Sequence, residues 1–90
     1  MSPGLLHSLT RGLLVLSQLL PFVLRGPHIP LDALLKATGL AESGGRAKTL
    51  IGDGQVQVDG SVELRKTCKI RAGQRVRLAE REILVEAGPD

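Results

Sequence analysis

The chain has almost no aromatic residues: Phe22 stands alone, with no Trp and no Tyr. Aromatic side chains are the platforms on which proteins stack unpaired bases, so any nucleic-acid surface here must recognise backbone and shape. Cysteine is equally scarce, because Cys68 has no second cysteine with which to form an internal disulfide. Only His7 and His28 accompany it, far away in the sequence, which does not fit the ligand spacing of a zinc site. We therefore expect no metal, no cofactor and a reducing cytoplasm as the setting.

The chain also lacks a hydrophobic run long enough for a membrane-spanning helix. Its most apolar stretch, residues 12–24, is interrupted by Ser17, Gln18 and Pro21 and falls short of the roughly 20 residues that a span needs. No small-residue cleavage site follows, which argues against a signal peptide. Leucines at intervals of three and four instead predict an amphipathic helix in residues 1–20, an extension ahead of the folded domain. These leucines are Leu5, Leu9, Leu13, Leu16 and Leu20.

Acidic residues are missing from the first third of the chain, and basic residues gather in its second half. The formal net charge is +3 over 90 residues, which favours anionic partners without identifying one. This length suits one small domain. Between residues 43 and 78, eight basic residues face only three acids. The basic residues are Arg46, Lys48, Arg65, Lys66, Lys69, Arg71, Arg75 and Arg77.

The spacing of apolar residues predicts two short helices. In residues 31–40 three leucines share one helical face, and Gly39 supplies a left-handed stop. The second helix is expected to begin at Ser43, whose hydroxyl can accept a hydrogen bond from free backbone N–H groups, and to end at Gly54. Its apolar stripe consists of Ala47, Leu50 and Ile51.

Alternation with a period of two predicts strands on either side of these helices. A short strand is expected in residues 22–26 and a final one in residues 82–87. Asp59 and Gly60 form a strong hairpin signal, because a tight primed turn needs residues that accept positive φ. The fold class that we expect is α+β, with two short helices packed on one small, mainly antiparallel sheet. The residues expected to point inward from the middle strands are Val56, Val58, Val62, Leu64, Cys68, Ile70, Val76 and Leu78.

The stretch "SGGRAKTLIGDGQVQVDG" at residues 43–60 combines glycines with lysine and threonine, as a nucleotide-binding loop does. The Walker pattern requires glycine six residues before its lysine and again immediately before it. With Lys48 as that lysine, Glu42 and Ala47 occupy the two positions, which excludes the loop. The chain also offers no placed acid–base pair, so we expect neither an enzyme nor a small-molecule substrate. Cys68 is expected in the core, with a reactive thiol as the alternative.

The basic residues point more sharply to a function. Arg46 and Lys48 lie in the first turns of the second expected helix, whose N-terminus carries partial positive charge. The preceding glycines would let free backbone N–H groups approach an anion closely. Basic residues also follow the hairpin in the run "RKTCK". A merely solvated basic face is the alternative interpretation.

The order of these elements and several of their residues resemble the S4 RNA-binding domain, a module named after the fourth protein of the small ribosomal subunit. The corresponding parts here read "LDALLKATGL", "SGGRAKTLI", "GQVQVDG" and "AGQRV". The resemblance covers residues 22–87 and is strongest to the small stand-alone, YbcJ-like subgroup, which shares "SGG-x-AK", "VDG" and "RK-x-CKI". It implies an alpha-L arrangement in residues 21–90. Residues 1–20 have no counterpart in the family. They are either an added extension or the result of a start codon assigned too early.

The resemblance further implies binding to structured RNA, such as ribosomal or transfer RNA, with the ribosome as a candidate partner and no membrane partner. Many family members have arginine directly after the capping serine, and its side chain often contacts the RNA. This chain has Gly44 at that position, so backbone N–H groups or Arg46 would have to make the contact instead. An RNA-modifying enzyme of this family would need a further domain. A protein-interaction or membrane-peripheral adaptor acting through residues 1–20 is the main alternative. The RNA-binding residues that we predict are Ser43, Gly44, Gly45, Arg46, Lys48, Gln55, Asp59, Gly60, Arg65, Lys66 and Lys69.

Overall fold

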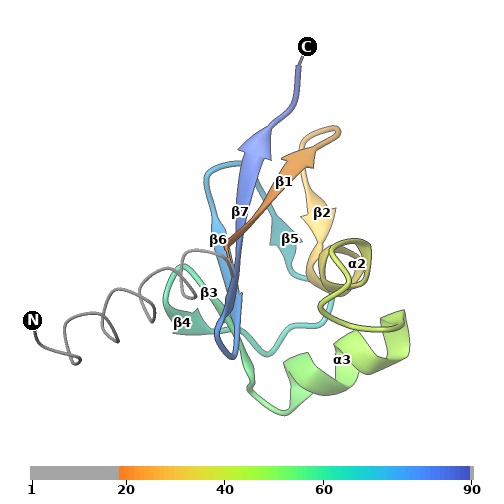
Figure 1. Cartoon of the computed structure of the whole chain (residues 1–90). Helices are drawn as coiled ribbons and strands as arrows, with labels where there is room; N and C mark the ends of the chain where they lie inside the picture. The colour runs from red at the N-terminus through yellow and green to blue at the C-terminus, as the bar shows by residue number, and fades with distance from the viewer. Residues whose placement is uncertain (1–18, 90) are drawn as a thin grey trace, which may run out of the picture.

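Two helices and two sheets make up residues 19–89, the part of the chain that the computed structural model describes (Figure 1). The helices are α2 (Leu31–Ala37) and α3 (Gly44–Gly52). The strands are β1 (Leu19–Leu24), β2 (Ile29–Pro30), β3 (Val56–Val58), β4 (Ser61–Val62), β5 (Lys69–Ile70), β6 (Arg75–Leu78) and β7 (Arg81–Ala87).

The mainly antiparallel sheet that we predicted forms, and two further strands pair apart from it. Five strands form this sheet in the order β1-β7-β6-β3-β4, in which β1 runs parallel to β7 and the other neighbours are antiparallel. β2 and β5 pair separately as a short antiparallel sheet. The first strand also begins at Leu19, ahead of the predicted residue 22. Pro21 is compatible with this strand because β1 lies at the edge of the sheet, where a missing N–H breaks no ladder.

The helix expected in residues 1–20 lies outside the described residues except for its last two positions. There the expectation is wrong, because Leu19 and Leu20 belong to β1 and pair with Glu82 and Ile83. In a strand these two side chains point to opposite faces.

Both predicted helices form, and local signals define their ends. The Ser43 hydroxyl accepts a hydrogen bond from the N–H of Arg46 at 3.1 Å, which caps α3 as expected. Gly39 and Gly54 follow the two helices with φ of +79° and +78°, a conformation that glycine adopts without steric cost.

The start of α2 has no side-chain cap and depends on a distant segment. The N–H of Leu31 donates to the carbonyl of Cys68 at 2.8 Å, and that of Asp32 donates to the carbonyl of Lys66 at 3.0 Å. These bonds satisfy two of the free donors at the helix N-terminus. They also fix the chain between β4 and β5 against α2.

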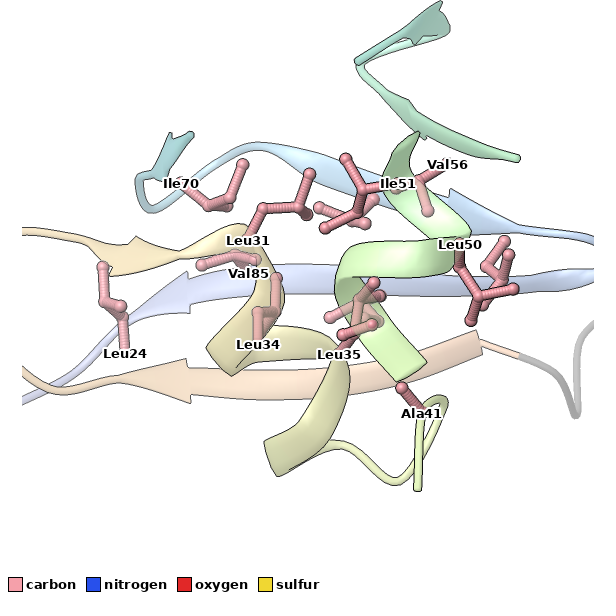
Figure 2. Packing of buried hydrophobic residues seen from close by; sticks show 14 residues of the cluster. Leu24, Leu31, Leu34, Leu35, Ala41, Leu50, Ile51, Val56, Ile70 and Val85 are labelled. Carbon is pink, nitrogen blue, oxygen red and sulfur yellow. The ribbon is translucent and has the colours of Figure 1, made fainter. Parts of the chain in front are cut away.

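The core lies between the helices and one face of the five-stranded sheet, as the side chains in Figure 2 show. The predicted inward positions Val56, Ile70, Val76 and Leu78 are buried, and Val58 and Cys68 pack against them half-buried. The buried helix residues include Leu31, Leu34, Leu35, Ala47, Leu50 and Ile51.

Two of the predicted core residues are exposed. Val62 is 55% exposed and Leu64 59% exposed. The reason is topological, because β4 has only two residues and lies at the far edge of the sheet. The Val62 side chain faces away from the helices, since it pairs with Gln57 rather than with a core position.

Candidate nucleic-acid interface

The N-terminus of α3 presents free backbone donors at the surface. Ser43 and Gly45 are exposed, and Gly44 is half-buried. The Ser43 hydroxyl is engaged by the N–H of Arg46, whereas the N–H groups of Gly44 and Gly45 have no hydrogen-bond partner within residues 19–89. Two donors at the positive end of a helix dipole suit an anion such as phosphate.

The two glycines at the start of this helix, Gly44 and Gly45, have no structural requirement within the described chain. A Cβ added at Gly44 would meet nothing within 4 Å, and one at Gly45 would meet only the Ser43 hydroxyl at 3.9 Å. Neither residue has a positive φ. Glycine inside a helix is about 1 kcal/mol less favourable than alanine. Gly44 and Gly45 are the first two residues of α3, so only part of that penalty applies to them, and their missing side chains leave an open surface at the helix N-terminus.

The two cations of α3 lie on either side of this open surface. Successive residues of a helix are rotated by about 100°, which places Arg46 and Lys48 on opposite flanks of the outer face. Gly45, Thr49 and Gly52 lie between them, opposite the buried stripe. A ligand that reached this ridge would have a positive charge on each side.

Lys66 approaches the same helix from the segment between β4 and β5. Its Cε lies 3.4 Å from where a Cβ of Gly52 would stand, so the missing side chain makes room for the lysine stem. Lys48, one turn before Gly52, has its Nζ 3.9 Å from the Asp32 carboxylate. The Asp32 N–H also donates to the Lys66 carbonyl, so the backbone of Lys66 lies beside the residue whose carboxylate Lys48 approaches. The structure thus brings two predicted lysines together.

The Arg65 guanidinium is held by an acid more tightly than the lysine side chains are. Its Nε and Nη2 both donate to the Glu63 carboxylate at 3.0 Å, and its backbone N–H donates to the same group at 2.9 Å. These bonds lower the pKa of Glu63 from its ordinary 4.5 to about 2. The pair is therefore ionised at neutral pH with no net charge, and we expect Arg65 to contribute less to anion binding than the sequence alone suggests.

A surface hollow of about 400 Å³ lies next to this pair and is lined by Arg65, Thr67, Cys68 and Lys69. Lys69 is exposed on β5, opposite Pro30. Burial raises the pKa of the Cys68 thiol, and the nearby Glu63 adds to that effect. The thiol is therefore protonated at neutral pH, which does not favour the reactive-thiol alternative.

The predicted hairpin residues have a different role. Asp59 and Gly60 adopt φ of +51° and +86°, as a primed hairpin turn requires. The Asp59 carboxylate accepts the Arg75 N–H at 2.9 Å and the Gln74 side-chain amide at 3.2 Å, and these bonds lower its pKa. Its bonds are made to β6 and the turn before it, not to the basic residues of α3.

Gln55 also lies apart from the lysines. It is exposed and lines a second hollow, of about 340 Å³, together with Gln57, Arg77 and Ala79. Sequence reasoning missed Asp32, Gly52 and Glu63 as parts of the site. Only Glu63 carried a local signal, namely an acid two residues from an arginine; the others act through contacts between distant segments.

No group of three or more potential metal ligands occurs among residues 19–89. In that same part of the chain, no helix is both long and apolar enough to cross a bilayer.

The class of this protein follows from its α+β fold and from comparison with known families. The model of the S4 domain matches residues 22–86, and the chain belongs to this family. Its fold class is as predicted, since two helices with a mainly antiparallel sheet are also found in a solved relative.

Within the family, the chain is similar to the Escherichia coli (strain K12) protein named "Putative RNA-binding protein YbcJ". The two are 54% identical over 61 residues, which cover 68% of this chain and 87% of the relative. The YbcJ protein of Shigella flexneri has the same identity and coverage. The solution structure of Escherichia coli YbcJ, described as revealing an "alfaL motif involved in RNA-binding", has a TM-score of 0.58 and 47% identity. That match covers 78% of this chain and 87% of the other.

Proposed function

We propose that this chain is a non-enzymatic RNA-binding module that holds the sugar–phosphate backbone of a folded RNA against α3. The observation that carries the proposal is the start of α3, where two backbone N–H groups are free and two glycines, which nothing in the described chain requires, leave the approach to them open. The RNA binding named for the YbcJ relatives supports it.

In this proposal each part of the site contacts the RNA phosphates in a different way. A phosphate accepts hydrogen bonds from the N–H groups of Gly44 and Gly45, where the helix dipole favours a negative charge. Lys48 and Lys66 attract phosphates as flexible point charges, and Arg46 and Lys69 extend the positive surface on either side. The near absence of aromatic residues favours recognition of shape over the stacking of unpaired bases.

The proposed targets are folded RNAs such as ribosomal and transfer RNA, and through the former the ribosome. A folded RNA presents phosphates from separate strands at short spacing, which suits cations that come from α3 and from the segment before β5. A cytoplasmic location stays a prediction that rests on the lone cysteine.

The test that follows from the glycines separates binding from folding. Gly45→Ala is expected to leave the stability of the domain unchanged or to raise it, because alanine is the better helix former. It should nevertheless weaken binding to a labelled transfer RNA or ribosomal RNA fragment, because the methyl group and the more rigid backbone hinder the approach of a phosphate. Lys48→Ala should weaken binding about tenfold, as the loss of one charge-assisted contact does.

Arg25→Ala is the matched control for the loss of a positive charge. Arg25 lies in the connection between β1 and β2, at the far end of the domain from α3 (Figure 1). Its removal should change RNA affinity little. Equal loss of affinity in Arg25→Ala and Lys48→Ala would show unspecific charge attraction, and unchanged affinity in both Gly45→Ala and Lys48→Ala would refute the site.

A further inference from the structure

The hollow that contains Gln55 is lined mainly by side chains that form hydrogen bonds. It measures about 340 Å³, and its lining residues are Gln55, Gln57, Arg77 and Ala79. Sites for small ligands have volumes of about 300–1,000 Å³. Gln57 and Arg77 are paired across the neighbouring strands β3 and β6 (Figure 1), so their side chains stand on the same face of the sheet. Two amides and one guanidinium therefore line one space.

The Arg77 guanidinium is held on one side and open on the other. Its Nε donates to the Ala79 carbonyl at 3.2 Å. Glu82, its partner in the register of β7, forms an ion pair with Arg75 at 3.2 Å instead. Within residues 19–89 Arg77 therefore forms no ion pair, and its two Nη groups remain as a planar fork of donors.

The two glutamines supply both kinds of hydrogen-bonding group. A glutamine amide has two N–H donors and one carbonyl acceptor. Neither the Gln55 nor the Gln57 side chain has a hydrogen-bond partner among residues 19–89. A phosphate offers acceptors only and would leave the amide carbonyls without a partner. A nucleobase suits the hollow better, because its edges carry donors and acceptors.

We propose that this hollow binds a guanine base of the RNA held by α3, an inference that rests on the function proposed above. Guanine has two neighbouring acceptors, O6 and N7, and their contact with one arginine is the commonest base-specific contact in DNA recognition. The N1–H and the N2 amino group on its other edge are donors that suit the amide carbonyls of Gln55 and Gln57. Adenine has an amino group where guanine has O6, so a donor would face the donors of Arg77.

The position of the hollow also fits an RNA bound along α3. Gln55 lies two residues after Asp53, the C-cap of α3, and its N–H donates to the Leu50 carbonyl of that helix at 3.2 Å. Side chains do not reach base edges in the deep major groove of an RNA helix, so the guanine would come from a loop or a bulge. A base held by its edges needs no aromatic platform, and the scarcity of aromatic residues therefore does not exclude this site.

An NMR titration of the full-length, isotope-labelled protein tests the base preference without any RNA. Guanosine monophosphate (GMP) and adenosine monophosphate (AMP) carry the same phosphate, so a difference between them reports on the base. We expect GMP to shift the side-chain amide signals of Gln55 and Gln57, and AMP to bind about tenfold more weakly. Arg77→Lys keeps the charge but loses the fork, and it should abolish the preference. Arg71→Lys, at an exposed position between β5 and β6, should retain it.

Binding of two labelled RNA hairpins, with guanine or adenine at the same loop positions, separates this inference from the proposed function. The guanine hairpin should bind about tenfold more tightly. Lys48→Ala should weaken both hairpins equally, and Arg77→Lys should remove the difference between them.

Each contrary result has a distinct meaning. Equal effects of GMP and AMP, with the glutamine signals unmoved, would overturn the guanine site even if both hairpins bind tightly. A preference for GMP together with equal affinity for the two hairpins would assign the hollow to a free guanine nucleotide and refute its role as a site for an RNA base. A preference for GMP with no binding of either hairpin would refute the proposed function and, with it, the RNA base.

Discussion

Single residues in this domain have roles that their type alone does not reveal. Asp59 belongs to a motif that resembles an RNA-contacting hairpin, yet both of its carboxylate oxygens accept hydrogen bonds that hold the turn to β6. Gly60 next to it supplies the second left-handed position. By contrast, Gly44 and Gly45 have no such internal task. A glycine in a turn and a glycine in an open helix end look alike in a sequence, and only the backbone conformation separates them.

A pair of substitutions at Asp59 tests its role as a turn residue. Asp59→Ala removes two hydrogen bonds and places a residue with a Cβ penalty at positive φ, so we expect a loss of about 1–3 kcal/mol in the free energy of unfolding. Asp59→Asn should cost less, because asparagine tolerates that conformation and keeps one acceptor oxygen. Urea denaturation measures both.

RNA affinity of the same variants distinguishes a turn residue from a contact residue. Under conditions where Asp59→Asn is fully folded, its affinity for a folded RNA should equal that of the wild type. A clear loss of affinity in Asp59→Asn without loss of stability would make Asp59 a direct RNA contact instead.

The helices and strands could be predicted where residues within or next to each element determine its bounds and its buried face. The start of α3 follows from a capping serine and the ends of both helices from the glycines after them, and the buried faces follow from the spacing of apolar residues. The segment between β4 and β5 was not predictable in this way. Its position depends on hydrogen bonds that the backbone N–H groups at the start of α2 donate to the carbonyls of Lys66 and Cys68, and no pattern in the sequence encodes a pairing across more than 30 residues. Val62 and Leu64 were wrongly assigned to the core because their alternating pattern does not show that β4 is a two-residue strand at the edge of the sheet.

The segment between β4 and β5 also provides a prediction of pH dependence. Because the folded state lowers the pKa of Glu63 from 4.5 to about 2, the folded state favours the ionised carboxylate. The contribution of this group to stability is therefore fully present above pH 4.5 and is lost as the pH falls toward 2. We expect Glu63→Gln to be less stable than the wild type at neutral pH, and the difference to shrink between those two values.

Urea denaturation of the wild type and Glu63→Gln at a series of pH values measures that difference. Asp53→Asn is a suitable control, because Asp53 is exposed and forms no ion pair within residues 19–89. A gap between wild type and Glu63→Gln that stays constant down to pH 2 would contradict the bidentate pairing with Arg65.

At the scale of the whole molecule, positive charges from two distant segments lie along one helix, with Arg46 and Lys48 in the first turns of α3 and Lys66 beside its last residue, Gly52. Sequence reasoning predicted the cations of α3 and of the run after the hairpin, but it could not show that the Lys66 side chain lies against Gly52, one turn after Lys48. Nor could it show that Arg65 is neutralised by Glu63 or that Asp59 faces a different element. Three cations of the predicted set, Arg46, Lys66 and Lys69, form no ion pair within residues 19–89, and Lys48 has only a long contact of 3.9 Å to the Asp32 carboxylate.

The dependence of RNA affinity on salt tests the central claim most directly. If these cations neutralise about four phosphates, a plot of log affinity against log salt concentration should have a slope of about −3 to −4 for a folded RNA. Lys48→Ala and Lys66→Ala should each make the slope less steep by about 0.7–0.9, while Arg25→Ala should leave it unchanged. A flat salt response, or the same slope in the wild type and in both lysine variants, would contradict the proposal that this surface binds the phosphates of an RNA.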